Sequence, residues 1–280
     1  MKDAPATTIY LKDYAAPAYV IDSTDLTFDL FEDHADVRSI LQFVANPAAA
    51  KSDSLVLHGQ ELELKELVLT GKTGARVVVE AGHYVIADET LTIPSLSALL
   101  GDDTSSFELR CHTRIEPQNN TALEGLYKSK KMFCTQCEAE GFRRITYFPD
   151  RPDVLSVYSV RMSGEKAAFP VLLSNGNLMS QGKLDDGRHF AHWVDPHKKP
   201  SYLFALVAGQ LVCREQRIVA RSGKEHLLQI YVRSGDLDKT EHAMNSLMAS
   251  VAWDEARFGL PLDLERFMIV ATSDFNMGAM

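Results

Sequence analysis

Apolar and polar residues alternate along most of the chain, in short segments. Residues 25–30 give a clear example, with apolar side chains on one face and polar side chains on the other, as a half-buried β-strand requires. Clusters of Gly, Asp, Asn and Pro separate these segments, which favours an antiparallel sheet system. Further strands are predicted at residues 39–45, 54–59, 61–71, 75–88, 90–96, 106–117, 202–216 and 227–235.

Two short segments are typical of tight hairpin turns. Residues 174–177 read Ser-Asn-Gly-Asn, and residues 185–187 read Asp-Asp-Gly. The Asn-Gly and Asp-Gly pairs supply the positive φ angles that such turns need. A hairpin is therefore predicted at each segment.

The pattern changes near Gly235. Residues 236–259 repeat apolar positions at three- and four-residue steps, as a helix does, and an apolar strand follows at residues 266–272. Asp236 is the predicted N-cap of the helix and Gly259 its predicted end. The apolar face of this helix is predicted to hold Met244, Leu247, Met248, Val251 and Phe258.

These elements divide the chain into two predicted parts. Residues 1–210 are expected to form a β domain, and residues 211–280 to open an α+β domain. The second part, about 70 residues with one good helix, is too small to bury a large core by itself. The predicted fold class is therefore mainly β, with an incomplete second domain.

Composition and charge narrow the class of protein. The 280 residues are 45% hydrophobic and 24% charged, as in a soluble globular protein with a sizeable core. The net charge of −9 disfavours a nucleic-acid partner, since such binding rests on Lys and Arg. No secretory signal or membrane-spanning run is found, so we expect a cytoplasmic protein with reduced thiols and no membrane partner.

The cysteines Cys134 and Cys137 form a C-x-x-C pair with three possible meanings. A structural zinc site needs a second pair of ligands, but Cys111 and Cys213 are isolated in strand-like segments. A redox pair is expected at the start of a helix, whereas the surroundings here are β-rich and acidic. Buried reduced thiols are therefore the favoured interpretation.

Three histidines, His189, His192 and His197, lie within nine residues and suggest a metal site. Positions three apart on a strand point to opposite faces, so we expect His189 and His192 to diverge. His58 and His226 are the other candidates, but neither is followed by a second histidine four residues later.

The carboxylates Glu138 and Glu140 follow Gln136 at two-residue steps, which places neighbouring members on the same side of an extended chain. A carboxylate with an amide oxygen, or two carboxylates, makes a receptor for an ammonium group. The alternative is an ordinary solvated surface. Residues 144–154, with their prolines, aspartates and arginine, are predicted to form a rigid corner held by Arg–Asp pairs.

Five segments together resemble one known family. They are NNTALEGLY at residues 119–127, CTQCEAEGFRRITYFPDRPDV at 134–154, LLSNGN at 172–177, KPSYLFALVAG at 199–209 and DFNMGAM at 274–280. In order and spacing they are similar to the aminopeptidase N family, zinc metallopeptidases of the gluzincin type, and most of all to the bacterial alanyl aminopeptidases. The resemblance covers essentially the whole chain. It implies an N-terminal saddle-like antiparallel β domain, followed by the beginning of a thermolysin-like catalytic domain.

The resemblance also implies roles for particular residues. Glu138, in the Q-C-E-A-E-G motif, is expected to bind the free α-amino group of a peptide, with Gln136 beside it. The two cysteines are then incidental. The sequence therefore predicts peptide substrates with a free N-terminal amine.

The end of the chain matches the first three positions of the family's G-A-M-E-N motif, which holds the N-terminal end of the substrate. These positions are Gly278, Ala279 and Met280. Met277, just before them, is expected to line the pocket for the first side chain, because its thioether adapts to varied shapes.

The family's zinc site and catalytic residues have no counterpart in this sequence. The 280 residues contain no H-E-x-x-H, and the downstream glutamate ligand and tyrosine of the family are not found either. We therefore expect zinc in the full-length enzyme, no catalytic or metal-binding residue in this chain, and no activity without the missing C-terminal remainder as partner. Two alternatives stay open: a non-catalytic β-sheet binding module of the same family, and a zinc-knuckle protein.

Overall fold

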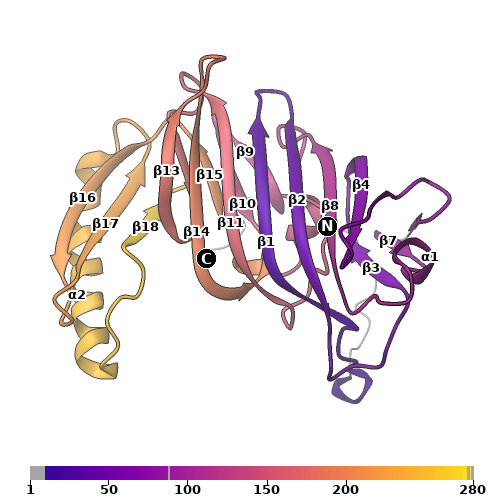
Figure 1. Ribbon diagram of the computed structural model, residues 1–280. Coiled ribbons are helices and arrows are strands. Elements are labelled where there is room, and N and C mark those ends of the chain that lie inside the picture. The colour runs from indigo at the N-terminus through magenta and orange to yellow at the C-terminus, as the bar shows by residue number, and fades with distance from the viewer. Residues whose placement is uncertain (1–9, 88, 276–277, 279–280) are drawn as a thin grey trace.

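The computed structural model describes residues 10–87, 89–275 and 278, and these residues fold mainly into β-strands (Figure 1). An eight-stranded sheet runs across the middle of the molecule in the order β13-β14-β11-β1-β2-β8-β4-β5. Its strands are β1 (Tyr19–Leu30), β2 (Ala35–Ala45), β4 (Glu63–Gly71), β5 (Arg76–Val78), β8 (Ser106–Ile115), β11 (Leu155–Glu165), β13 (Asn177–Lys183) and β14 (Arg188–Pro200).

Two smaller sheets and several short helical turns pack around this sheet. A four-stranded sheet has the order β12-β15-β10-β9, and a three-stranded sheet has the order β3-β7-β6. Their strands are β3 (Leu55–His58), β6 (Val85–Ala87), β7 (Thr90–Ile93), β9 (Gly125–Ser129), β10 (Met132–Gln136), β12 (Val171–Ser174) and β15 (Leu206–Gly209). The short helices are η1 (Leu11–Asp13), α1 (Ser97–Leu100), η2 (Phe142–Arg144), η3 (Ser201–Leu203) and η4 (Leu237–Thr240).

The C-terminal unit lies at one end of the molecule (Figure 1). It consists of a sheet of β16 (Val212–Val219), β17 (Glu225–Val232) and β18 (Arg266–Val270), together with helix α2 (Glu241–Phe258). The predicted domain boundary near Gln210 falls in the connection between β15 and β16. It stays a prediction, because Tyr231 of β17 packs into the main core on the other side of that connection.

The sequence pattern predicted antiparallel sheets, but two of the strand pairings are parallel. β1 pairs with β11 in parallel, and β17 pairs with β18 in parallel. Turn residues report only on strands that are neighbours in the sequence, whereas parallel partners need a long crossover connection. The sequence pattern therefore predicted the strands but not these pairings.

One predicted hairpin is confirmed and the other is wrong. Residues 185–187 join β13 to β14, with Gly187 at a φ of 83°. Residues 174–177 instead connect β12 of the four-stranded sheet to β13 of the eight-stranded sheet. Gly176 has a φ of 85°, and a Cβ there would overlap the carbonyl of Val194. This Asn-Gly pair therefore serves a close approach between sheets.

Two other predicted strands are divided in the structure. Residues 75–88 hold β5 and β6, which belong to different sheets, and Asp88 lies outside the described residues. Residues 202–216 hold η3, β15 and the start of β16. Both predictions failed because an apolar run does not reveal where a chain leaves one sheet for another.

Helix α2 ends as predicted but begins later. Gly259 adopts the left-handed conformation and its N–H donates to the Glu255 carbonyl, which is the expected C-terminal cap. Asp236 precedes η4 rather than α2, and its side chain makes no capping hydrogen bond. Its carboxylate pairs with Lys239 and Arg233 instead, which makes the predicted N-cap wrong.

The predicted apolar face of α2 is only partly buried. Met244 and Leu247 are buried against β17, and Met248 and Val251 are partly buried beside them. Phe258 is 63% exposed, and its ring packs edge-on against Trp253 instead. In the part of the chain that the structure describes, no helix combines the length and apolar character that a bilayer-spanning helix needs.

The main core lies between the eight-stranded sheet and the segments that cover it. Phe142 of η2 contacts the rings of Phe148 and Phe204, with ring centroids 4.8 and 5.3 Å apart, and all three side chains are fully buried. This packing fixes η2 at the end of the turn that carries Glu138.

Candidate functional site

The site is built on the turn that follows strand β10. Gln136 ends the strand, is fully buried, and donates a hydrogen bond from Nε2 to the Glu138 carbonyl at 3.2 Å. Glu138 itself is exposed, and its carboxylate has no hydrogen bond or ion pair with another residue of the described ranges. A buried amide therefore braces the backbone beneath a solvent-facing carboxylate.

Two glycines allow this turn to close tightly. The Gly141 N–H donates to the Cys137 carbonyl at 2.8 Å. A Cβ on Gly141 would overlap the Gln136 carbonyl and the Gly125 nitrogen. Gly125 has a φ of 70°, and a Cβ there would overlap Gly141 and Arg144. The turn thus packs directly on the start of β9, which limits where the Glu138 side chain can lie.

The second carboxylate of the motif is already committed to a partner. The Glu140 carboxylate forms an ion pair with Arg143, with Oε1 and Nη2 3.1 Å apart. Arg143 also donates from its backbone N–H and Nε to the buried carboxylate of Asp150, at 3.1 and 3.2 Å. Glu140 is therefore engaged in an ion pair, whereas the Glu138 carboxylate forms none with the described residues.

The corner at residues 144–154 is rigid, as predicted. Arg151 donates to both carboxylate oxygens of Asp153, at 2.8 and 2.7 Å. The Asp150 N–H donates to Nδ1 of His58 at 3.1 Å, and burial lowers the pKa of this histidine. Because a protonated Nδ1 could not accept that hydrogen bond, His58 is neutral here. The corner is a support for the turn of Glu138.

The two cysteines of the C-x-x-C pair are buried free thiols, as predicted. Cys137 lies in the main core, whereas Cys134 lies in a separate cluster with Tyr127 and Met132. Burial raises the pKa of Cys134 to about 11 and that of Cys137 well above its ordinary value. Neither thiol is poised to form the thiolate that metal binding or redox exchange requires.

His189 and His192 of β14 contact different partners, as predicted from their spacing, and His197 contacts a third. His189 Nε2 lies 2.6 Å from the Phe169 carbonyl, and His192 Nε2 lies 3.0 Å from the Ser159 hydroxyl. His197 pairs with Asp263. Across residues 10–87, 89–275 and 278, no three His, Cys, Asp or Glu side chains are grouped as metal ligands. The residues singled out for zinc therefore do not fit a zinc ion.

The segment near the C-terminus contacts strand β9, which pairs with β10. The Tyr127 hydroxyl donates to the Asp274 carbonyl, and the Ser129 hydroxyl donates to the Asp274 carboxylate, both at 2.6 Å. Sequence analysis did not single out these two residues of β9, although Tyr127 ends the N-N-T-A-L-E-G-L-Y segment. Gly278 is exposed. The predicted site residues Met277, Ala279 and Met280 lie outside the described residues.

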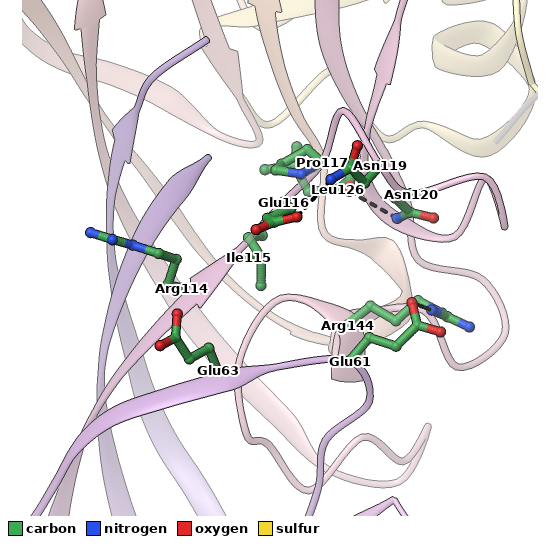
Figure 2. Close-up of a pocket in the computed structure, with 10 residues that line it drawn as sticks. All are labelled: Glu61, Glu63, Arg114, Ile115, Glu116, Pro117, Asn119, Asn120, Leu126 and Arg144. Atoms are coloured by element: carbon green, nitrogen blue, oxygen red, sulfur yellow. Dashed lines mark hydrogen bonds and ion pairs between the residues drawn. The ribbon is translucent and has the colours of Figure 1, made fainter. Parts of the chain in front are cut away.

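A pocket of about 250 Å³ lies beside the start of β9 (Figure 2). Arg144 lines one side of it, pairing with Glu61 at 2.7 Å and Glu124 at 3.5 Å. Gln136 and Glu138 are not part of its wall, and sequence analysis did not predict it. The wall is formed by Glu61, Glu63, Arg114, Ile115, Glu116, Pro117, Asn119, Asn120, Leu126 and Arg144.

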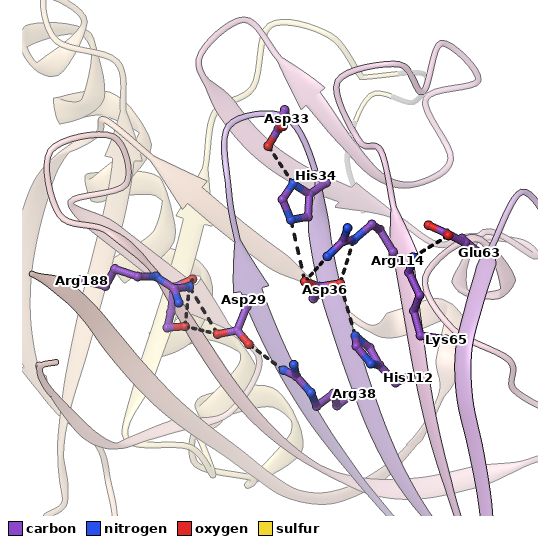
Figure 3. A network of polar contacts seen from close by, with 11 residues as sticks. Asp29, Asp33, His34, Asp36, Arg38, Glu63, Lys65, His112, Arg114 and Arg188 are labelled. Atoms are coloured by element: carbon purple, nitrogen blue, oxygen red, sulfur yellow. Dashed lines mark hydrogen bonds and ion pairs between the residues drawn. The ribbon is translucent and has the colours of Figure 1, made fainter. Parts of the chain in front are cut away.

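Arg114 links this pocket to a polar network on the eight-stranded sheet (Figure 3). Its Nε and Nη2 donate to the two carboxylate oxygens of Asp36, at 3.0 and 2.9 Å, and His112 lies 3.3 Å from the first oxygen. These hydrogen bonds, from Arg114 above all, lower the pKa of Asp36 to about 2. The network ties neighbouring strands together through an ionised carboxylate.

Comparison with known proteins identifies the relationship. Residues 20–203 match the profile of the Peptidase M1 N-terminal domain. The chain belongs to the peptidase M1 family. The predicted resemblance and the mainly β fold class of its N-terminal domain are therefore confirmed.

Named M1 relatives are aminopeptidases. The chain is 44% identical to aminopeptidase N of Caulobacter vibrioides over 280 residues, which is all of this chain and 31% of that protein. It is 44% identical to aminopeptidase N of Escherichia coli over 271 residues, which is 97% of this chain and 29% of that protein. The chain thus spans about three tenths of the length of these relatives.

A solved structure of an aminopeptidase has the same fold. The crystal structure of Legionella pneumophila aminopeptidase A in complex with aspartic acid matches with a TM-score of 0.87 and 31% identity. The match covers 96% of this chain and 30% of that one. The role of Glu138, the domain boundary and the cytoplasmic location stay predictions.

Proposed function

We propose that this chain is the amine-recognising N-terminal part of an aminopeptidase, an enzyme that removes N-terminal residues from peptides. The observation that carries the proposal is the Glu138 carboxylate, exposed and unpaired in the described part of the chain, on a turn braced by Gln136 and Gly141. Membership of the M1 family and the aminopeptidase names of its relatives support it.

Glu138 would recognise the N-terminal ammonium group of a peptide. A charge-assisted hydrogen bond between ammonium and carboxylate is stronger than a neutral one, and an acetylated N-terminus cannot make it. The Arg143 ion pair removes Glu140 from competition, so the peptide amine has one carboxylate of this turn to choose. We propose that Gly278, Ala279 and Met280 hold the same end of the peptide and that Met277 lines the pocket for its first side chain.

Zinc would have to be held by residues other than those singled out here. The cysteine pair is buried in two separate clusters, and the β14 histidines contact three different partners. Bound zinc would supply Lewis-acid chemistry for peptide hydrolysis. We propose that this chain does not hydrolyse peptides without its C-terminal remainder, and we assign no hydrolytic step to its residues.

The test compares a dipeptide with a free amine, L-alanyl-L-leucine, with its N-acetylated form. Binding to the 280-residue chain is followed by NMR, with zinc content and turnover measured on the same sample. We expect the free-amine peptide to bind at least about tenfold more tightly, and Glu138→Gln to remove that preference. Glu140→Gln, two residues away and engaged by Arg143, is the matched control and should keep it.

Two results would contradict the proposal. An unchanged preference in Glu138→Gln would remove Glu138 as the amine receptor and favour a non-catalytic binding module. Zinc-dependent turnover by the wild-type chain, with stoichiometric bound zinc, would show that the chain carries a metal site of its own.

A further inference from the structure

The two faces of the sheet formed by β16, β17 and β18 differ in chemistry. On β17, Leu228, Ile230 and Val232 face α2 and form a dry apolar cluster with it. The alternate positions of the same strand face the eight-stranded sheet, and they include Gln229 and Tyr231. A sheet face buried between two layers is normally apolar, so this polar face needs an explanation.

A cavity of about 370 Å³ lies on the polar face. Residues of β12, β13 and β14 form one wall, and residues of β16, β17 and β18 form the other. Its volume falls within the range of small-molecule sites. Its lining includes His189, Trp193, Glu215, Gln229, Tyr231 and Arg266.

Gln229 is a buried amide with half of its hydrogen-bonding capacity unused. The residue is 4% exposed, and its Nε2 donates to the Glu215 carboxylate at 2.6 Å. Its Oε1 is buried and has no hydrogen-bond partner among the described residues. An unsatisfied buried acceptor is costly, which points to a donor that occupies the cavity.

Arg266 is a cation without an anionic partner among the described residues. Its guanidinium lies 5.2 Å from the centroid of the Trp193 ring, and its buried Nε has no hydrogen-bond partner in the described part of the chain. Glu215 lines the same cavity but forms no ion pair with Arg266 among these residues. The cavity therefore presents a positive and a negative group that do not neutralise each other.

His189 does not add a second cation. Its Nε2 lies 2.6 Å from the Phe169 carbonyl, which can only accept a hydrogen bond, so Nε2 carries a proton. Burial lowers the pKa of this imidazole, which favours its neutral form. The charges that face the cavity are thus one guanidinium and one carboxylate.

We propose that this cavity binds a free α-amino acid as a zwitterion. The ligand carboxylate pairs with Arg266, and its ammonium group donates to Glu215 and to Oε1 of Gln229. An apolar ligand side chain packs against Trp193 and Tyr231. A simple anion would be repelled by Glu215 and a simple cation by Arg266, whereas a zwitterion satisfies both. The site is separate from Glu138, and the proposal does not rest on the function assigned to that residue.

The competing occupant is ordered water, which also satisfies buried polar groups. Ligand chemistry separates the two without any substitution in the cavity. L-leucine carries both charges, N-acetyl-L-leucine lacks the ammonium group, and L-leucinamide lacks the carboxylate. We expect saturable binding of L-leucine to the full chain, measured by tryptophan fluorescence, and at least tenfold weaker binding of both analogues. Trp253→Phe, at an exposed position on α2, leaves Trp193 as the reporter.

Variants locate the site. Arg266→Gln and Gln229→Leu should each weaken L-leucine binding at least tenfold, and circular dichroism checks that they fold. Arg217→Gln is the matched control, because Arg217 is an exposed arginine on the neighbouring strand β16.

Three results would overturn the proposal. The first is no saturation by L-leucine up to about 10 mM, which would leave water as the occupant. The second is equal binding of L-leucine and the two analogues. The third is a leucine signal that disappears in Glu138→Gln but persists in Arg266→Gln, which would place the amino acid at the Glu138 turn.

Discussion

The main core and the C-terminal unit use the same kinds of apolar residue with very different outcomes. In the main core, Phe142 contacts the rings of Phe148 and Phe204 edge to face, and all three side chains are fully buried. In the C-terminal unit, Trp253 and Phe258 touch each other at the end of α2 but are 60% and 63% exposed. An aromatic side chain stabilises the fold only where other elements cover it.

Several hydrogen bonds hold the C-terminal unit together and join it to the β domain. The Arg221 backbone N–H donates to the buried Glu255 carboxylate at 3.1 Å, which ties the hairpin of β16 and β17 to α2. Across to the β domain, the Glu265 backbone N–H donates to Oδ1 of Asn177, and Asp274 accepts from the hydroxyls of Tyr127 and Ser129. The large aromatic side chains of the β domain are therefore covered, whereas the C-terminal unit combines a small apolar cluster with specific hydrogen bonds.

The largest expected effect contrasts one phenylalanine from each region. Phe142→Ala removes a ring from the centre of the aromatic cluster and should lower the free energy of unfolding by about 3–5 kcal/mol. Phe258→Ala, at an exposed position, should change it by less than about 0.5 kcal/mol. Urea unfolding followed by circular dichroism measures both values.

Equal losses in the two variants would contradict this contrast. They would mean that the ring of Phe258 is covered in solution and that the C-terminal unit packs more tightly than its exposure indicates. A normal m-value in both variants is the control that the unfolding transition itself is unchanged.

Sequence reasoning succeeded where the signal was local. Alternation gave β1, β2 and β8, the Asp-Gly pair before Arg188 gave a true hairpin, and Gly259 gave the end of α2. In each case, the conformation depends on residues within a few positions along the chain. The pairing of Gln136 with Glu138 was predicted from the motif, but the predicted convergence of their side chains is wrong, because Gln136 is buried and Glu138 is exposed.

It failed where the decisive partner lies far away in the sequence. The parallel pairing of β1 with β11, and the docking of Asp274 on Tyr127 and Ser129, join segments separated by more than a hundred residues. The exposure of Phe258 depends on what lies opposite the helix, and helical spacing does not report that. The cavity lined by Gln229 and Arg266 was missed for the same reason, because a polar residue in a strand looks solvent-facing until a second sheet covers it.

A smaller loss of stability is expected when a glycine is replaced by alanine, either in the β domain or in the C-terminal unit. Gly141 has an ordinary φ of −81°, but a Cβ there would overlap the Gln136 carbonyl and the Gly125 nitrogen, both backbone atoms. Gly141→Ala should therefore cost about 2–3 kcal/mol and weaken binding of free-amine peptides by shifting Glu138. Gly223 has a φ of 83° with open space around it, so Gly223→Ala should cost only about 1 kcal/mol.

Thermal unfolding and the dipeptide titration separate these two glycine effects. Peptide binding should weaken in Gly141→Ala and remain unchanged in Gly223→Ala. If Gly141→Ala were as stable as the wild type and bound peptide equally well, the turn would not be what positions Glu138.

The smallest effect concerns two aspartates whose pKa values are both lowered, Asp36 by Arg114 and Asp236 by Lys239. The Asp36 value falls from 3.8 to about 2, so its contribution is present above about pH 4 and is lost as the pH falls toward 2. Asp36→Asn should lower stability by about 1 kcal/mol at pH 7, with the difference vanishing near pH 2. Asp236, whose side chain is 26% exposed just before η4, should give a smaller change than Asp36 on substitution by asparagine. Unfolding midpoints measured from pH 2 to pH 7 decide the matter, and a parallel acid loss in wild type and Asp36→Asn would show that the Arg114 network does not stabilise the sheet.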